Sequence, residues 1–255
     1  MEEIINEIKQ KKEFSKINEK LIRKLLKRNK FYKRFLKSKK KNDRKKTIKS
    51  IRMLLRKIIT PMPKIFYKNF EYFIENLDNE EIIKKIIKIN ISTKERENIY
   101  EWLTNEIKKI NAKKIYDLGC GINAIVLYQY GINLNNYIGF DIDGYCIDLI
   151  KKFSELKNLN LKAIQKDVTE INFDEFEKND LILALKILDA LEEIELGISK
   201  KIVNTKSKKI ISFSIKSLSG KRMRERKWFE KILKEEKKNF IKIKKLNEIF
   251  YFIDL

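Results

Sequence analysis

Two acidic residues, each at the end of a short apolar run, could together form a small-molecule site. In KIYDLGCGINAIVLY, Asp117 precedes Gly119 and Gly121, and about twenty residues later the run YIGFD ends at Asp141. Glycine lets the backbone approach a ligand that a Cβ would keep away. An acid at the tip of a second strand can bind both hydroxyls of a ribose. The spacing therefore predicts a nucleotide-type cofactor at the strand ends.

The glycine pattern favours one kind of cofactor. NAD-binding loops usually carry a third glycine, and Ala124 stands in its place here. The D-x-G-x-G form resembles the S-adenosylmethionine motif of Rossmann-like methyltransferases. The alternative is an α/β domain whose glycines serve only its turns and which binds no nucleotide.

The methyltransferase resemblance implies S-adenosylmethionine as cofactor. It implies that Asp117 and the glycine loop lie by the amino-acid end, that Asp141 binds the ribose, and that Asp167 contacts the adenine amine. The cofactor-binding residues implied in this way are Asp117, Gly119, Cys120, Gly121, Asp141, Ile142, Asp167, Val168 and Leu185.

Glycine and proline divide the chain into two regions. All seven glycines follow Asp117, whereas Pro61 and Pro63 precede it, which indicates a helical front and an α/β back. In the back, helical stretches separate most of the short β-type runs KIYDL, YIGFD, LKAIQ, DLILALK, KIISFSI, FIKIKKL and EIFYFID. This alternation predicts a doubly wound, mostly parallel seven-stranded sheet, with the last strand in an antiparallel hairpin. The expected fold class is α/β, Rossmann-like, preceded by an all-α basic domain.

The front has apolar residues at helical spacing within residues 21–36 and 48–59. KSKKKNDRKK is expected to join these two helices, and TPMP to end the second, because proline cannot continue a helix. A further helix is expected over ISTKERENIYEWLTNEIKKI, with Ser92 and Glu95 as a capping box. We expect a helical domain over residues 1–90 and a Rossmann-like domain over residues 91–255.

The positive charge is concentrated in the helical front. The chain carries 59 Lys+Arg against 36 Asp+Glu, a net charge of +23, and residues 1–70 hold 25 of these bases but only 6 of the acids. A lysine-rich proteome would spread the excess more evenly, so the pattern favours a polyanion partner. Nucleic acid is preferred over an anionic membrane, because the apolar stripes are sized for a small core. The representative RNA contacts are Lys24, Arg28, Lys46, Arg52 and Arg56.

The missing residue types limit the chemistry. With no histidine, a histidine base and a Ser-His-Asp triad are excluded, and with two cysteines a Cys/His zinc site is nearly excluded. We expect no metal. Cys120 is expected to be a small packing residue of the loop rather than a nucleophile. The first residues, MEEIINEIKQ, do not resemble a signal peptide, and no run is long enough to span a membrane, so a cytoplasmic protein is expected.

The candidate acceptors differ in the groups that they require. Methylation of an exocyclic amine typically goes with an [ND]PP[YF] tetrapeptide after the fourth strand, where this chain has ALKILDAL. Methylation of pyrimidine carbon 5 needs a cysteine nucleophile, and neither cysteine is well placed for it. Guanine N7 has a lone pair and no proton, so transfer needs only in-line positioning and a suitable field.

Five segments carry a more specific resemblance. STKER (92–96), DLGCGINAI (117–125), ALKILDALE (184–192), ISFSIKSLSGK (211–221) and KWFE (227–230) resemble the Arm/Rmt-type 16S rRNA guanine-N7 methyltransferases, which confer aminoglycoside resistance. The resemblance implies a helical domain that docks on the small ribosomal subunit, and methylation of a guanine N7 of 16S rRNA at the decoding region. A monomer is the default expectation.

The same family resemblance assigns further residues. Arg96 would pair with the cofactor carboxylate, and its alternative is a solvated helix charge. Lys186, Lys216, Ser217 and Ser219 would line the target pocket, with Lys186, Lys216 and Ser219 as the catalytic candidates; for the lysines the alternative is ordinary loop exposure. Two other functions stay open: methylation of another rRNA or tRNA base, and a non-catalytic ribosome-binding assembly factor.

Overall fold

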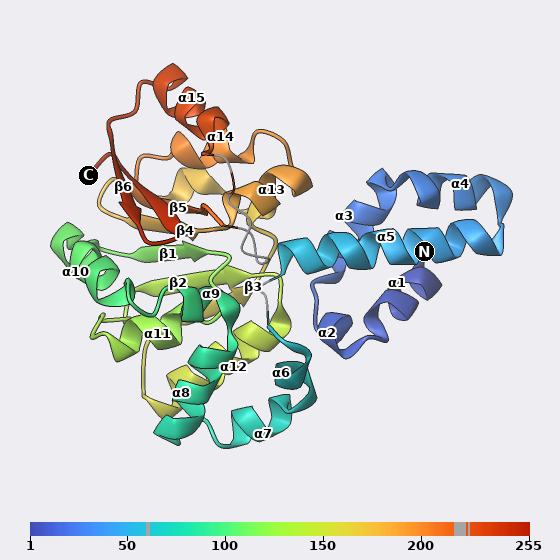
Figure 1. Cartoon of the computed structure of the whole chain (residues 1–255), viewed down its shortest axis with the longest axis horizontal. Coiled ribbons are helices and arrows are strands. Elements are labelled where there is room, and N and C mark those ends of the chain that lie inside the picture. Colours follow the sequence, from blue (N-terminus) through green and yellow to red (C-terminus); the bar gives the residue numbers. More distant parts are fainter. Residues whose placement is uncertain (60–61, 217–222, 224) are drawn as a thin grey trace.

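A seven-stranded sheet forms the centre of the structure (Figure 1). The computed structural model describes residues 1–59, 62–216, 223 and 225–255. The strands are β1 (Ile115–Leu118), β2 (Tyr137–Asp141), β3 (Lys162–Gln165), β4 (Leu181–Leu185), β5 (Lys208–Ser214), β6 (Phe240–Lys245) and β7 (Glu248–Ile253). Their order is β3-β2-β1-β4-β5-β7-β6, with β1 to β5 parallel and β7 antiparallel to β5 and β6. The predicted sheet, including its final hairpin, is confirmed.

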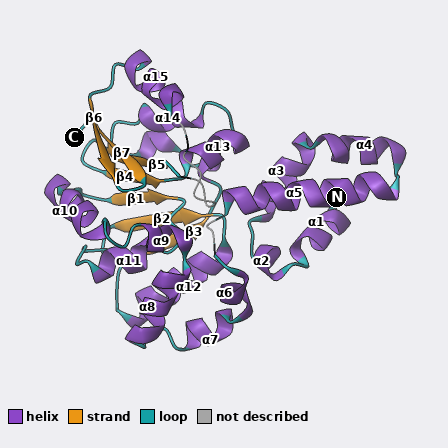
Figure 2. Ribbon diagram, viewed as in Figure 1, coloured by secondary structure: helices purple, strands orange, loops and turns teal. Residues whose placement is uncertain are grey.

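Helices cover both faces of this sheet (Figure 2). One face packs against α10 (Tyr100–Ile110), α11 (Asn123–Gln129) and α12 (Gly144–Leu156). The other packs against α13 (Leu188–Ile194), α14 (Ile198–Val203) and α15 (Lys227–Glu235). The short 3₁₀ turns η1 (Val168–Glu170) and η2 (Phe173–Glu175) follow β3. Because both faces are covered, the central strand β4 is apolar and buried throughout.

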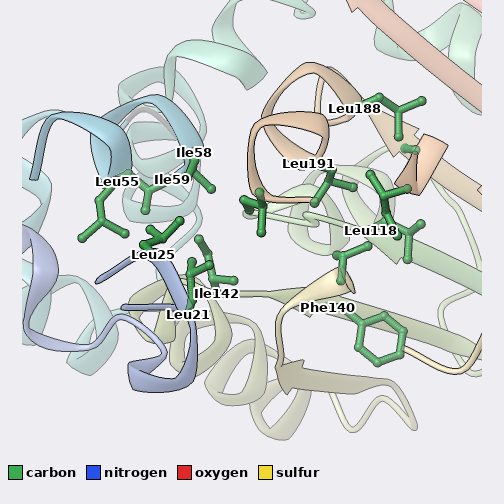
Figure 3. Packing of buried hydrophobic residues seen from close by; sticks show 14 of the residues in the cluster. Leu21, Leu25, Leu55, Ile58, Ile59, Leu118, Phe140, Ile142, Leu188 and Leu191 are labelled. Carbon is green, nitrogen blue, oxygen red and sulfur yellow. The ribbon is translucent and has the colours of Figure 1, made fainter. Parts of the chain in front are cut away.

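The first five helices lie beside the sheet and share its core. They are α1 (Glu2–Lys9), α2 (Lys12–Ser15), α3 (Glu19–Arg28), α4 (Lys30–Ser38) and α5 (Lys41–Ile58). In Figure 3, Leu21 and Leu25 of α3 and Leu55 of α5 belong to the same buried cluster as Leu188 and Leu191 of α13. Burial of apolar surface therefore holds the basic helices against the sheet and its covering helix α13.

Residues 62–89 pack elsewhere. They form α6 (Lys64–Lys68), α7 (Phe70–Glu75) and α8 (Glu80–Ile89), which lie on the outer side of α11 and α12. Phe70 contacts Tyr145 of α12 edge-on, with ring centroids 4.7 Å apart. The helical front thus has two parts, one beside the strand ends and one behind the helices of the sheet.

Several expected helix limits were wrong. Residues 21–36 form two helices, because Asn29 is extended and its side chain accepts hydrogen bonds from the first amides of α4. The basic linker is shorter than expected, since α5 already begins at Lys41. As expected, α5 ends just before TPMP, at Ile58.

The expected helix over residues 91–110 is also interrupted. It consists of α9 (Ile91–Glu95) and α10, separated by a turn at residues 96–99. The N-cap of α9 is Asn90, whose Oδ1 accepts from the Thr93 amide, so the capping box at Ser92 and Glu95 was wrong. Asparagine is a favoured N-cap residue, and Asn90 caps the helix two positions before the expected cap, Ser92.

A segment of the helical front is hydrogen-bonded to the end of β2. Ile17 forms a β-bridge with Asp143, the Asn18 amide donates to the Ile142 carbonyl, and the Gly144 amide donates to the Lys16 carbonyl. These bonds fix the helical front directly beside Asp141 and Ile142. Among the residues that the structure describes, no helix is long and apolar enough to cross a membrane.

Replacing Gly144 by alanine tests this junction. A Cβ at Gly144 would lie 2.6 Å from the Lys16 carbonyl oxygen, so the backbone must move. We expect a loss of roughly 1–3 kcal/mol in the free energy of unfolding, although alanine favours helix over glycine. Hydrogen exchange at the Asn18 amide should accelerate. The control is Lys151→Ala, at an exposed position of the same helix, in which Asn18 exchange should not change. Unchanged protection in Gly144→Ala would contradict this account.

Candidate functional site

The loop after β1 turns sharply and brings backbone amides to the strand ends. Gly119 and Gly121 have φ of +68° and +49°, which favours glycine. The Gly121 amide donates to Asp141 Oδ2 at 2.8 Å, so the loop is tied to the tip of β2. Cys120 is buried, and burial raises the pKa of its thiol well above its usual value. It is therefore a packing residue, in agreement with its sequence interpretation.

Asp117 is a buried carboxylate with one oxygen unsatisfied. Its Oδ2 accepts hydrogen bonds from Tyr137 at 2.8 Å and from Asn123 at 3.1 Å. Its Oδ1 has no hydrogen-bond partner within the described part of the chain. Burial raises the pKa of Asp117 to about 6, although these hydrogen bonds oppose the shift. The fold thus places an unsatisfied hydrogen-bond acceptor beside the glycine loop, and its burial lowers the stability of the folded protein.

Arg96 is buried as well, which rules out the alternative of a solvated helix charge. Its side chain is 2% exposed, and its Nε lies 3.0 Å from both carboxylate oxygens of Glu248 on β7. One terminal nitrogen, Nη2, has no hydrogen-bond partner among the described residues. The guanidinium therefore keeps one donor available while its charge is balanced.

Arg96 lines a pocket at the strand ends, and Asp117 lies just before the glycine loop that lines the same pocket. A pocket of about 290 Å³ contains Arg96, the glycine loop that begins after Asp117, and the ends of β4 and β5. Its lining residues are Lys57, Ile58, Ile59, Asn90, Ser92, Thr93, Glu95, Arg96, Gly119, Cys120, Gly121, Ile122, Asn123, Leu185, Lys186, Ile187, Ala190, Ser214, Lys216 and Met223. An amino-acid group fits both atoms, because its carboxylate accepts from Arg96 and its ammonium donates to Asp117. The residues present thus fit the amino-acid end of S-adenosylmethionine.

The residues expected at the ribose and adenine lie next to this pocket, after β2 and β3. Asp141 is buried, and its Oδ1 accepts from the Asp143 amide at 2.9 Å. Ile142 and Val168 are buried apolar residues at neighbouring strand ends. Asp167 is buried, with Oδ2 unsatisfied and Lys24 Nζ 3.8 Å away. A buried acceptor that makes no hydrogen bond, beside apolar side chains, suits an adenine amine.

The expected target residues divide into three cases. Lys186, at φ +62°, has a side chain only 12% exposed and contacts Glu95 at 2.7 Å and Glu248 at 3.1 Å, so ordinary loop exposure is wrong for it. Lys216 is exposed and lines the pocket. Ser217 and Ser219 lie outside the described residues.

Four of the five candidate RNA contacts are engaged within the chain. Lys24 bonds to Thr169 and Glu195, and Arg28 donates to the Ile194 carbonyl. Arg52 bonds to carbonyls of α1, and Arg56 pairs with Glu13. Lys46 is exposed and has no ion-pair partner among the residues described. RNA contact by these residues stays a prediction, and Lys46 is the one of the five with no partner within the described part of the chain.

The sequence analysis missed Glu248, Tyr100 and Asn123. The Tyr100 hydroxyl lies 3.5 Å from Asn123 Oδ1, and Asn123 in turn bonds to Asp117. One signal was available for Glu248: it is the single acid at the start of an otherwise apolar buried strand. Its partners come from α9 and β4, which only the tertiary structure brings together.

The buried charge of Asp117 predicts a measurable stability cost. Its pKa of about 6 in the folded protein lies above the ordinary value of 3.8, so the folded state favours the protonated carboxyl. This stabilisation is complete below pH 4 and is lost as the pH rises through 6. Asp117→Asn should therefore stabilise the ligand-free protein at pH 7 by roughly 2–3 kcal/mol and flatten its stability between pH 4 and 6. Urea unfolding measures both, with exposed Asp174→Asn as the control. Destabilisation at pH 7 by Asp117→Asn would refute this.

Comparisons with known proteins identify the family. Residues 79–238 match the family model described as ribosomal RNA methyltransferase (FmrO). The 16S rRNA methyltransferase RmtF, in complex with S-adenosyl-L-homocysteine, superposes with a TM-score of 0.80 at 17% identity, covering 99% of this chain and 96% of that one.

Two further solved structures are similar over their whole length. An rRNA methylase from Escherichia coli has a TM-score of 0.76 at 22% identity, with 99% and 98% of the two chains covered. The 16S rRNA methylase RmtB has a TM-score of 0.71 at 23% identity, with 99% and 97% covered. No curated protein sequence matches this chain. Since the family model spans more than half of the chain, and the likeness to Arm/Rmt-type enzymes is confirmed, this protein belongs to the ribosomal RNA methyltransferase (FmrO) family.

Proposed function

We propose that this protein transfers a methyl group from S-adenosylmethionine to a guanine N7 of 16S rRNA, at the decoding region of the small ribosomal subunit. The observation that carries the proposal is a pair of unsatisfied buried atoms, Arg96 Nη2 and Asp117 Oδ1. Arg96 lines a pocket bordered by lysines, and Asp117 lies just before the glycine loop of that pocket. A pair of opposite charges suits the cofactor's amino acid, and the lysines suit an RNA substrate.

The chain's own residues would bind the cofactor along the strand ends. S-adenosylmethionine, when bound, supplies a methyl group on a positively charged sulfur. Arg96 and Asp117 hold its amino-acid end, Asp141 its ribose hydroxyls, and Asp167 its adenine amine. Ile142, Val168 and Leu185 enclose the apolar parts. These contacts fix the direction in which the methyl group faces, which is the main requirement of in-line transfer.

Guanine N7 suits this site because its methylation removes no proton. The chain has no histidine, and both cysteine thiols are buried with raised pKa values. Lysines at the pocket mouth can donate to guanine O6 and leave N7 free. Lys216 is the best placed, because it is exposed and lines the pocket. Lys186 is restrained by Glu95 and Glu248, so it fixes the pocket wall.

The helical front would place the enzyme on the subunit. Its exposed lysines, such as Lys46, bind phosphates without reading sequence, so they set position rather than the target base. Lys57, Ile58 and Ile59 at the end of α5 also line the pocket, so a front docked on RNA delivers the base directly to the cofactor. Action as a monomer in the cytoplasm, with aminoglycoside resistance as the outcome, completes the proposal.

The first test is the transfer of labelled methyl groups from S-adenosylmethionine to purified small subunits, naked 16S rRNA and tRNA. We expect label on subunits, and a single chain cut near the decoding site after borohydride and aniline treatment, which cleaves at N7-methylguanosine. Label without cleavage would assign another atom. Label on tRNA alone would assign another substrate. Ribosome binding without label would indicate a non-catalytic assembly factor.

Lys216→Ala tests the target side of the pocket separately. Because Lys216 lies outside the cofactor contacts, we expect methyl transfer to fall at least tenfold while the affinity for S-adenosylhomocysteine stays within twofold. The matched control is Lys206→Ala, an exposed lysine before β5 at the opposite edge of the sheet. Equal activity of the two variants would remove Lys216 from the target site.

A further inference from the structure

Glu248 holds together the charged groups of the pocket, although no resemblance assigns it a role. It is the first residue of β7, 1% exposed, and stands opposite Ser214 in the register with β5. Arg96 reaches it from α9 and Lys186 from the end of β4. Ser212 of β5 donates a further hydrogen bond to Glu248 Oε1. Three separate segments thus converge on one buried carboxylate.

The charge of this carboxylate is secure at neutral pH. Burial would raise the pKa of Glu248, but the charges of Arg96 and Lys186 outweigh burial and lower it. Both oxygens of Glu248 face Arg96 Nε at 3.0 Å, so the guanidinium is held by one edge. The planar fork of arginine fixes where its other nitrogens point, and Nη2 is the one without a partner among the described residues.

Besides Glu248, two other groups interact with the Arg96 guanidinium: the Tyr100 hydroxyl and the Asp117 carboxylate. Arg96 lies close enough to lower the pKa of Asp117, and Asp117 Oδ1 is unsatisfied among the residues described. An arginine released from Glu248 would turn toward that oxygen, because an unpaired buried charge is costly. Arg96 and Asp117 would then neutralise each other, and neither would remain for a ligand.

We propose that Glu248 is a positioning residue that keeps Arg96 apart from Asp117, so that each retains one unpaired atom for the opposite charges of the cofactor's amino-acid end. This inference rests on the proposed binding of S-adenosylmethionine. The ion pair requires the desolvation of two buried charges, which lowers stability. It also keeps the pocket arranged for the zwitterionic amino-acid end of the cofactor. If Glu248 only fastened β7 to the sheet, its loss would weaken every ligand equally. The positioning role instead affects only ligands that carry the amino-acid end of the cofactor.

Two ligands separate positioning from a structural role. S-adenosylhomocysteine carries the amino-acid end, whereas 5′-methylthioadenosine shares the adenine, ribose and sulfur but lacks that end. For Glu248→Gln we expect the Kd of S-adenosylhomocysteine to rise roughly tenfold or more, and that of methylthioadenosine to change less than twofold. Calorimetric titration of the full chain gives both values. The matched control is Glu230→Gln. The Glu230 carboxylate accepts a hydrogen bond from Tyr251 of β7 but does not line the pocket.

Further variants keep the test decisive if Glu248→Gln folds poorly. Ser212→Ala removes one hydrogen bond from Glu248 and should raise the Kd of S-adenosylhomocysteine alone, by less than Glu248→Gln does. Arg96→Met should weaken S-adenosylhomocysteine, and adding Glu248→Gln to it should cause no further loss. Equal weakening of both ligands, or of neither, would overturn the inference while leaving the proposed function intact. Failure of the unsubstituted protein to bind S-adenosylhomocysteine would overturn both.

Discussion

The buried contact between Arg96 and Glu248 connects the parts of this molecule that must act together. Arg96 follows α9, just before the sheet begins, and Glu248 starts the strand that is inserted last between β5 and β6. A buried ion pair is weak evidence for stability, because desolvation of both charges offsets their attraction. Its value here lies in geometry, since it fixes a guanidinium at the floor of a pocket whose other wall is the glycine loop.

The same principle applies to the other charges at the strand ends. Asp117, Asp141 and Asp167 are all buried, and two of them keep an oxygen unsatisfied among the described residues. Apolar helices that cover both faces of the sheet supply the stability that these acids cost. A site built in this way is prepared before its ligand arrives, which is the usual relation between stability and function at a binding site.

The helical front belongs to this arrangement and is more than an electrostatic anchor. Its core is continuous with that of α13 and β1 (Figure 3). Residues 16–18 are also hydrogen-bonded beside the tip of β2. Lys24 contacts Asp167, and the end of α5 lines the pocket, so the basic helices lie next to the carboxyl ends of the strands at two points. In the proposed function, this coupling lets the basic helices, once docked on RNA, place one base accurately.

The sequence by itself determined the strands and the placement of two acids at their ends. Strand periodicity and the placement of glycine are local signals, so the sheet, its final hairpin, and the positions of Asp117 and Asp141 near the ends of β1 and β2 followed from them, whereas Asp167 was assigned through the family resemblance. Helix limits at Asn29 and Asn90 were less accurate, because a single capping side chain decides them.

The tertiary structure alone decided which charges meet. Glu248 lies 152 residues from Arg96, and Lys24 and Arg52 carry positive charge in a basic segment but are engaged with neighbours inside the chain. Pairing of distant charges depends on how the layers pack, and no local pattern in the chain encodes it.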